Sequence, residues 1–246
     1  MNAFPKLPNA PIQEALLDIR VQARQGLHAS EFDELFGQLH PAFSVSEVMR
    51  SMRAKIRLEP TGEATTRTSD AGETGRLFKS AEGNRIVQCR VDGMTVNMLR
   101  PYSSFEDLYE VFSSTWALYR EVARPTALTR IAVRYINRFE IPKTGNLIEF
   151  VATAPATVVD DSYISGFTQS TVHGFSSRGE TVILNTALEL PLDGGSPNMV
   201  LDIDAFREVD VDMSNQDLAS AFTELRHLKN SFFFKVIGPR AMEKFK

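Results

Sequence analysis

The sequence predicts an α+β protein built around an antiparallel sheet, and three observations lead to this class. Residues 12–24 and 129–141 alternate apolar and polar side chains, as half-buried strands do. Strand-like runs joined by tight turns follow the first of these segments, and turns this short connect only antiparallel neighbours. Amphipathic helical patterns occur late in each half of the 246-residue chain, and 43% hydrophobic content is enough to form a core.

The first half opens with a strand at 14–24, in which Leu17, Ile19 and Val21 lie on one face. A short helix is expected in the segment "HASEFDELFGQLHP", capped by Ser30 and ended by Pro41. Four strand-like runs follow, "MRAKIRLEP", "GRLFKSAE", "RIVQCRVDG" and "GMTVNMLRP". The segment at 61–75, rich in Gly, Thr and Ser, is expected to be a mobile loop or the tip of a long hairpin.

A long amphipathic helix closes the first half at "SSFEDLYEVFSSTWALYREV", where two serines followed by acidic residues suggest a capping box. The second half starts again with the strand at 129–141 and a short helix at "NLIEFV". A second long helix is expected from about Ser214, and the tail "SFFFKVIG" is expected to be a last strand or an apolar plug. Strand-like segments lie between these helices near 155–160, 162–173, 180–190 and 199–206.

The order of elements suggests an internal duplication with halves at 1–125 and 126–246, which together form one compact unit. At an offset of 114 positions, Arg20 and Arg24 align with Arg134 and Arg138. Chance alignment of generic strand and cap patterns is the alternative. Each half then has the order β-α-β-β-β-β-α, which predicts one curved antiparallel sheet with both long helices on one face. The arrangement is similar to the saddle of TATA-box-binding proteins, an analogy of fold that implies no function.

The arginines of the two long strands are the candidate binding residues. Arg130, Arg134 and Arg138 share one face of a strand, and arginine offers a planar fork for phosphate or carboxylate groups. The alternative is that they form ion pairs across strands with acids such as Asp18 and Glu140. Tyr135 or Phe139 could stack on a base. The full candidate set is Arg20, Arg24, Arg130, Arg134, Tyr135, Asn137 and Arg138.

No catalytic or metal-binding signature stands out. Asp202 and Asp204 could hold a divalent cation, but such pairs are common, and an acidic surface or an arginine partner is the simpler interpretation. The four histidines lack zinc-site spacing, and no phosphate-binding glycine motif occurs. We therefore expect no catalytic residue, no metal and no cofactor, and the sequence favours a protein that is not an enzyme.

Charge and cysteine content limit the compartment and the partners. Residues 1–123 and 124–246 each carry a net charge of −2, with 14 basic against 16 acidic residues in the first segment and 13 against 15 in the second. This balance gives no bulk attraction to nucleic acid or anionic lipid. The single cysteine, Cys89, fits a reducing compartment, and no stretch has the length of a membrane span. A cytoplasmic location and no membrane partner are expected.

The segments "LPNAPIQEALLDIRV" and "VRYINRFEIP", together with the Phe-rich end, resemble a sporadically distributed, largely uncharacterised bacterial protein family of about this length. Patchy distribution implies a mobile or defence-associated system, and the resemblance supplies no activity. The residues that carry it are Pro11, Glu14, Arg134, Tyr135, Asn137 and Arg138.

The leading hypothesis is therefore a non-catalytic bacterial binding or interaction protein, an accessory or regulatory component of such a system. It would engage a partner protein through a sheet face or its apolar tail. Recognition of nucleic acid or a nucleotide through the arginine-lined face is the alternative. A metal-dependent enzyme acting on phosphorylated substrates through Asp202 and Asp204 is the least favoured. A homodimer is expected, because a second copy could cover the open face of the sheet.

Overall fold

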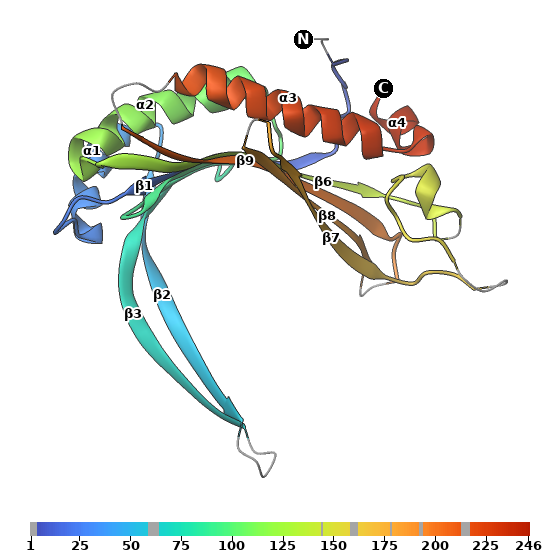
Figure 1. Cartoon of the computed structure of the whole chain (residues 1–246), viewed down its shortest axis with the longest axis horizontal. Helices are drawn as coiled ribbons and strands as arrows, with labels where there is room; N and C mark the ends of the chain where they lie inside the picture. Colours follow the sequence, from blue (N-terminus) through green and yellow to red (C-terminus); the bar gives the residue numbers. More distant parts are fainter. Residues whose placement is uncertain are drawn as a thin grey trace.

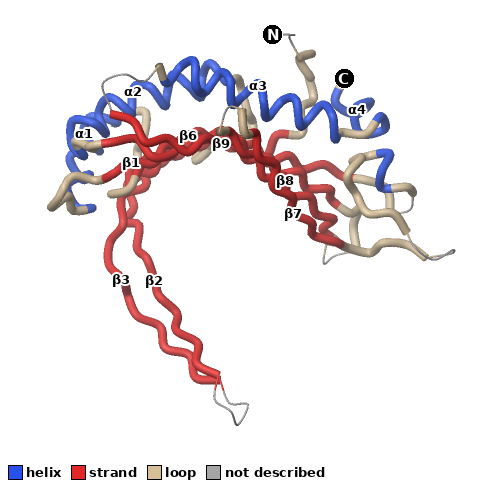
Figure 2. Tube along the Cα trace, viewed as in Figure 1, coloured by secondary structure: helices blue, strands red, loops and turns tan. Residues whose placement is uncertain are grey.

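Nine strands form a single antiparallel sheet in the computed structural model, in the order β2-β3-β4-β5-β1-β6-β9-β8-β7. The structure describes residues 4–58, 64–143, 145–157, 162–177, 179–191, 194–212 and 217–246. The sheet arches beneath a layer of helices, which all lie on its convex side (Figure 1; Figure 2). The α+β class and the antiparallel sheet are thus confirmed.

The first half supplies one side of the sheet. Its strand β1 pairs with β5 on one side and with β6 on the other, so that it lies at the centre. Its elements are β1 (Ile12–Gln22), η1 (Ala29–Glu34), α1 (Leu35–Leu39), β2 (Val45–Leu58), β3 (Ala64–Lys79), β4 (Arg85–Arg90), β5 (Gly93–Leu99) and α2 (Phe105–Ala123).

Two predictions about the first half are refined by the structure. The expected short helix begins as a 3₁₀ turn after His28, not after Ser30, because the backbone N–H of His28 donates to Glu31 Oε1 at 2.8 Å. The segment at 61–75 belongs in part to a long hairpin, since β3 begins at Ala64 and pairs with β2 along its length. This hairpin extends far from the helix layer (Figure 1).

The second half comprises β6 (Ala127–Glu140), η2 (Leu147–Glu149), β7 (Phe167–Phe175), β8 (Glu180–Glu189), β9 (Asn198–Asp212), α3 (Leu218–Val236) and α4 (Pro239–Phe245). The described residues contain three strands after β6 where four were predicted. Residues 155–157 and 162–166 form no strand, and 158–161 lie outside the described residues. The predicted helix start at Ser214 also lies outside them, and Asp217 caps α3.

The Phe-rich tail is not a strand, because residues 231–236 form the last turns of α3. Helical spacing places Phe233 in the core at 6% exposure, with Phe232 and Phe234 partly exposed beside it. In a helix these three successive rings point in three different directions, so they need not share one face.

The core lies between the sheet and the helices. Helix α2 packs on β1 and β5, and α3 packs on β6 and β9. Ser104 accepts the N–H of Asp107 at 3.0 Å and caps α2, whose Leu108, Phe112 and Tyr119 are fully buried. Because side chains alternate along each strand, every strand residue that faces the helices is flanked by residues that face the concave side.

Candidate functional site

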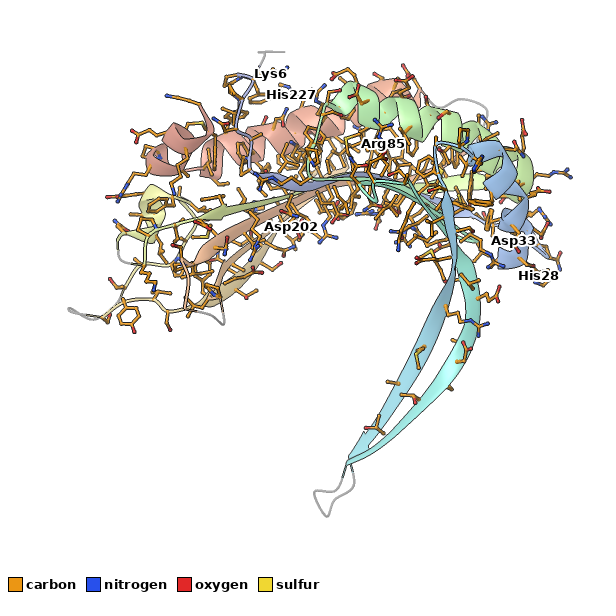
Figure 3. The ribbon with its side chains drawn as sticks, turned by 180° about the vertical axis from the view of Figure 1, so that it is seen from behind. Lys6, His28, Asp33, Arg85, Asp202 and His227 are labelled. Carbon is orange, nitrogen blue, oxygen red and sulfur yellow. The ribbon has the colours of Figure 1, made fainter. Side chains whose placement is uncertain are left out.

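The concave face of the sheet, opposite α2 and α3, carries most of the candidate arginines. Directly paired residues of neighbouring strands point to the same face, so the strand register defines rows of side chains across it. One such row runs through Leu16, Arg134, Asp204 and Ile183. We call this surface the arginine face. Asp202 points into the concavity from it (Figure 3).

Asp18 is the centre of the first charge cluster on the arginine face. Its carboxylate is 6% exposed and accepts from Arg90 at 2.9 Å, Arg130 at 3.1 Å, Arg20 at 3.3 Å and the Thr95 hydroxyl at 2.7 Å. Burial alone would raise the pKa of Asp18, but the Thr95 hydrogen bond and the three guanidinium charges together lower it. Arg20 and Arg130 are direct cross-strand partners, so the negative charge of Asp18 offsets the repulsion between their two positive charges.

Asp204 shares Arg130 with Asp18 but has fewer donors. Arg130 donates to its Oδ2 at 2.8 Å, while its Oδ1 is buried and has no hydrogen-bond partner among the described residues. Burial raises the pKa of Asp204, and the charges of Arg130 and Arg134 offset this only in part. Two carboxylates bound to one guanidinium thus differ in pKa because their donor sets differ.

Asp202 and Arg134 form the second cluster. Arg134 donates twice to this carboxylate, at 2.8 and 2.7 Å, and Asn185 adds a bond at 3.0 Å. The bidentate contact raises the pKa of Arg134 and fixes the plane of its guanidinium. Arg138 has a weaker, exposed partner, Glu189, at 3.2 Å.

Aliphatic side chains lie between these charges. Leu16, Ile136, Ile183 and Val200 are partly exposed on the arginine face, and Val172 of the edge strand β7 is 68% exposed. The face therefore presents paired charges interleaved with apolar groups.

The structure brings together four of the seven predicted binding residues, Arg20, Arg130, Arg134 and Arg138. Arg24 lies beyond the end of β1 and forms an ion pair with Glu31 of η1. Tyr135 and Asn137 are 2% and 3% exposed and face the helices, because odd-numbered residues of this part of β6 point away from the arginine face. Phe139, 7% exposed, lies on the same side, so neither aromatic ring is available for stacking beside the arginines.

Metal binding finds no support in the described part of the chain, where no group of three or more His, Cys, Asp or Glu side chains could hold an ion. Asp202 and Asp204 do share a face, but Arg134 binds both oxygens of Asp202 and Arg130 binds one oxygen of Asp204. Burial raises the pKa of the Cys89 thiol to about 12, so this thiol is not a reactive nucleophile.

One residue that sequence reasoning missed is Lys229 of α3. It is 7% exposed and lines a cavity on the helix side of the sheet, together with Tyr135 and Asn137. A signal existed, because Lys229 falls in the helical stripe formed by Phe222, Leu225 and Phe233, where an apolar residue is expected.

A scan against models of known protein families and a search of curated proteins both found no match. Among the described residues, no helix is long and apolar enough to cross a membrane.

Proposed function

We propose that this protein is a non-catalytic binding protein whose arginine face engages a partner protein. The observation that carries the proposal is charge pairing. Each of the five arginines Arg20, Arg90, Arg130, Arg134 and Arg138 has a carboxylate oxygen within 3.3 Å. These five guanidiniums therefore offer no uncompensated positive charge to a polyanion, and the aliphatic groups beside them suit a partner that also mixes apolar and charged groups.

The shape of the sheet supports a binding role. The concave face lies between the long β2–β3 hairpin and the β7–β8 hairpin, and none of the described helices covers it (Figure 2). Covering it would bury Leu16, Ile136 and Ile183, and the fixed ion pairs would set the register of the partner. An accessory or regulatory role in a bacterial mobile or defence-associated system is part of this proposal and rests on the sequence resemblance.

We also infer that the fold arose by duplication of a unit that corresponds to residues 1–125 and 126–246, which gives a saddle like that of TATA-box-binding proteins. The first residues of α2 and α3, Phe105 and Leu218, lie 113 positions apart, and both helices have 19 residues. Strands β1 and β6 meet at the centre, and each half adds its remaining strands outward. The first half has four strands after β1, whereas the described part of the second half has three strands after β6. This is the main difference between the halves.

A capture experiment tests the proposed function. The bait would be the wild-type protein and the double variant Arg138→Glu/Val172→Glu, which alters two exposed positions of the arginine face. The control Ser113→Glu/Lys235→Glu changes the net charge equally but alters exposed positions of α2 and α3. We expect one stoichiometric protein from nuclease-treated lysate of the source cells on the wild type and control, and its loss from the double variant. Equal capture by all three baits contradicts the proposal.

The nucleic-acid alternative makes the opposite prediction. Fluorescence anisotropy with labelled single-stranded and duplex oligonucleotides should show no binding at physiological salt if the guanidiniums are already paired. Binding that weakens steeply with salt and is lost in Arg134→Ala would favour the alternative. Light scattering of the purified protein distinguishes a third outcome, in which a second copy of the chain is the partner.

A further inference from the structure

The helix side of the sheet holds a cavity of about 610 Å³, which we call the lysine cavity. Its walls are the N-terminal segment from Phe4 to Ile12, residues 100–106 and the part of α3 from Arg226 to Phe234. Tyr135 and Asn137 of β6 also line it. Cavities of this size are typical of small-molecule sites.

The N-terminal segment is held in place as a wall of the lysine cavity. Pro11 accepts the backbone N–H of Arg138 at 2.8 Å, and the N–H of Asn9 donates to the carbonyl of Phe245 at 3.1 Å. At its outer end, Phe4 stacks on Phe234 with ring centroids 5.1 Å apart and contacts His227 at 4.9 Å. Lys6 and His227 both lie on the helix side of the sheet (Figure 3).

Lys229 contributes a buried amine to the lysine cavity. Its Nζ lies 3.6 Å from the centre of the Tyr135 ring, and no carboxylate among the described residues forms an ion pair or hydrogen bond with it. The neighbouring cation Arg226 is already bound to Glu106 at 2.9 Å. Burial, reinforced by the charge of Arg226, lowers the pKa of Lys229 to about 7. The charged and titratable side chains that line the cavity are Lys6, Arg100, Tyr102, Glu106, Tyr135, Arg226 and Lys229.

The tyrosines near this amine are neutral and do not supply the missing anion. The hydroxyls of Tyr102 and Tyr135 are hydrogen-bonded to each other at 2.8 Å. Burial raises the pKa of Tyr102 to about 12, and burial also raises the pKa of Tyr135 well above its ordinary value. A buried ammonium group without a counter-ion is costly, and a ligand that brings a negative charge would offset this cost.

We propose that the lysine cavity binds a small organic acid, with its single anionic group at Lys229 Nζ. The apolar body of the ligand would contact Leu7, Phe105 and Phe233, and the amide of Asn230 is available for hydrogen bonding. The site lies on the opposite side of the sheet from the arginine face, so this proposal does not depend on the partner protein.

A pair of dyes tests the proposal directly. Anilinonaphthalene sulfonate carries one anionic group on an aromatic body, and N-phenylnaphthylamine is its neutral counterpart. We expect the wild-type protein to bind one sulfonate dye per chain, and Lys229→Met to weaken this binding at least about tenfold, as loss of one charge-assisted hydrogen bond would. Affinity for the neutral dye should change by less than about threefold, because Met keeps the length of the side chain.

Two further variants keep this test decisive. Lys235→Met removes an exposed lysine from the same helix and should leave both affinities unchanged. Asn230→Asp retains Lys229 but places a carboxylate on the cavity wall, and should also weaken binding of the sulfonate dye. Circular dichroism and thermal unfolding confirm that each variant is folded. Equal affinity of wild type and folded Lys229→Met for the sulfonate dye, or equal losses for both dyes, would overturn the proposal.

Discussion

The arginine face and the lysine cavity differ in how their cations are paired. On the arginine face every named guanidinium has a carboxylate partner, and Asp18 alone serves Arg20, Arg90 and Arg130. On the helix side Lys229 is almost fully buried, and none of the described carboxylates pairs with it. Anion binding by a surface therefore depends less on the number of its cations than on whether each cation already has a carboxylate partner.

Removing the shared carboxylate of the arginine face should have the largest effect on stability. Asp18→Asn leaves three clustered guanidiniums without their common anion, and we expect the free energy of unfolding to fall by about 3 kcal/mol. Asp92→Asn is the matched control, because Asp92 pairs with Arg20 and Arg90 but its side chain is 55% exposed; its cost should stay below about 1 kcal/mol. Chemical denaturation measures the free energy of unfolding of both variants. Equal losses would show that burial of Asp18 does not increase its contribution to stability.

The Asp18 contribution should depend on pH. Since the pKa of Asp18 is lower in the folded protein than in the unfolded chain, its stabilisation is complete above the unfolded pKa of about 3.9 and is lost as the pH falls through the folded pKa. The stability gap between wild type and Asp18→Asn should therefore be constant near neutral pH and shrink below about pH 4. A gap that stays constant down to pH 2 would contradict this assignment.

Lys229→Met should have the next largest effect, and with the opposite sign. Replacing a buried, unpaired amine by an apolar side chain of similar length should stabilise the ligand-free protein by about 2 kcal/mol near neutral pH. This corresponds to a rise in melting temperature of roughly 2–4 °C per kcal/mol for a chain of this size. Lys235→Met, at an exposed position, should change stability by less than about 0.5 kcal/mol.

The pH dependence of this gain has a definite sign. The folded pKa of Lys229 lies near 7 and the unfolded value near 10.5, so the unfolded chain holds the additional proton between these pH values. Wild-type stability should rise relative to Lys229→Met across that window, and the advantage of the variant should fade. A destabilised Lys229→Met protein would mean that the amine has a structural partner.

The smallest effect is expected at the edge of the arginine face. Arg138→Ala breaks an exposed pair with Glu189 and should cost less than about 0.5 kcal/mol, vanishing at high salt. Arg134→Ala, in the same strand, breaks a bidentate contact to Asp202, whose side chain is 10% exposed, and should cost about 1.5 kcal/mol. Thermal unfolding at low and high salt checks whether the loss of stability is larger for the more buried ion pair.

Strand periodicity predicts which arginines share a face, and it also places Tyr135 and Asn137 on the other face of the sheet. Alternation along 129–141 places Arg134 and Arg138 on one face, and the structure confirms this placement. The same alternation places Tyr135 and Asn137 on the opposite face. Tyr135 is a candidate for base stacking and both residues carry the family resemblance, but adjacent residues of a strand point to opposite faces.

The lysine cavity could not be predicted from local patterns. Its walls come from residues 4–12, 100–106 and 226–234, which only the tertiary fold brings together. The position of Lys229 within an apolar helical stripe hinted at burial, but nothing in the sequence shows whether a carboxylate lies beside it. Pairing of charges depends on cross-strand register and helix packing, and these were not determined by the periodicity of single segments.

An NMR titration of the protein labelled at the lysine ε-carbon would test the central contrast most directly. The exposed Lys235 serves as an internal reference on the same helix. The account predicts that Lys229 titrates near pH 7 and that its pKa rises when the sulfonate dye binds. A Lys229 signal that titrates near its ordinary value of 10.5, unchanged by the dye, would contradict the claim that Lys229 is a buried amine without a carboxylate partner among the described residues.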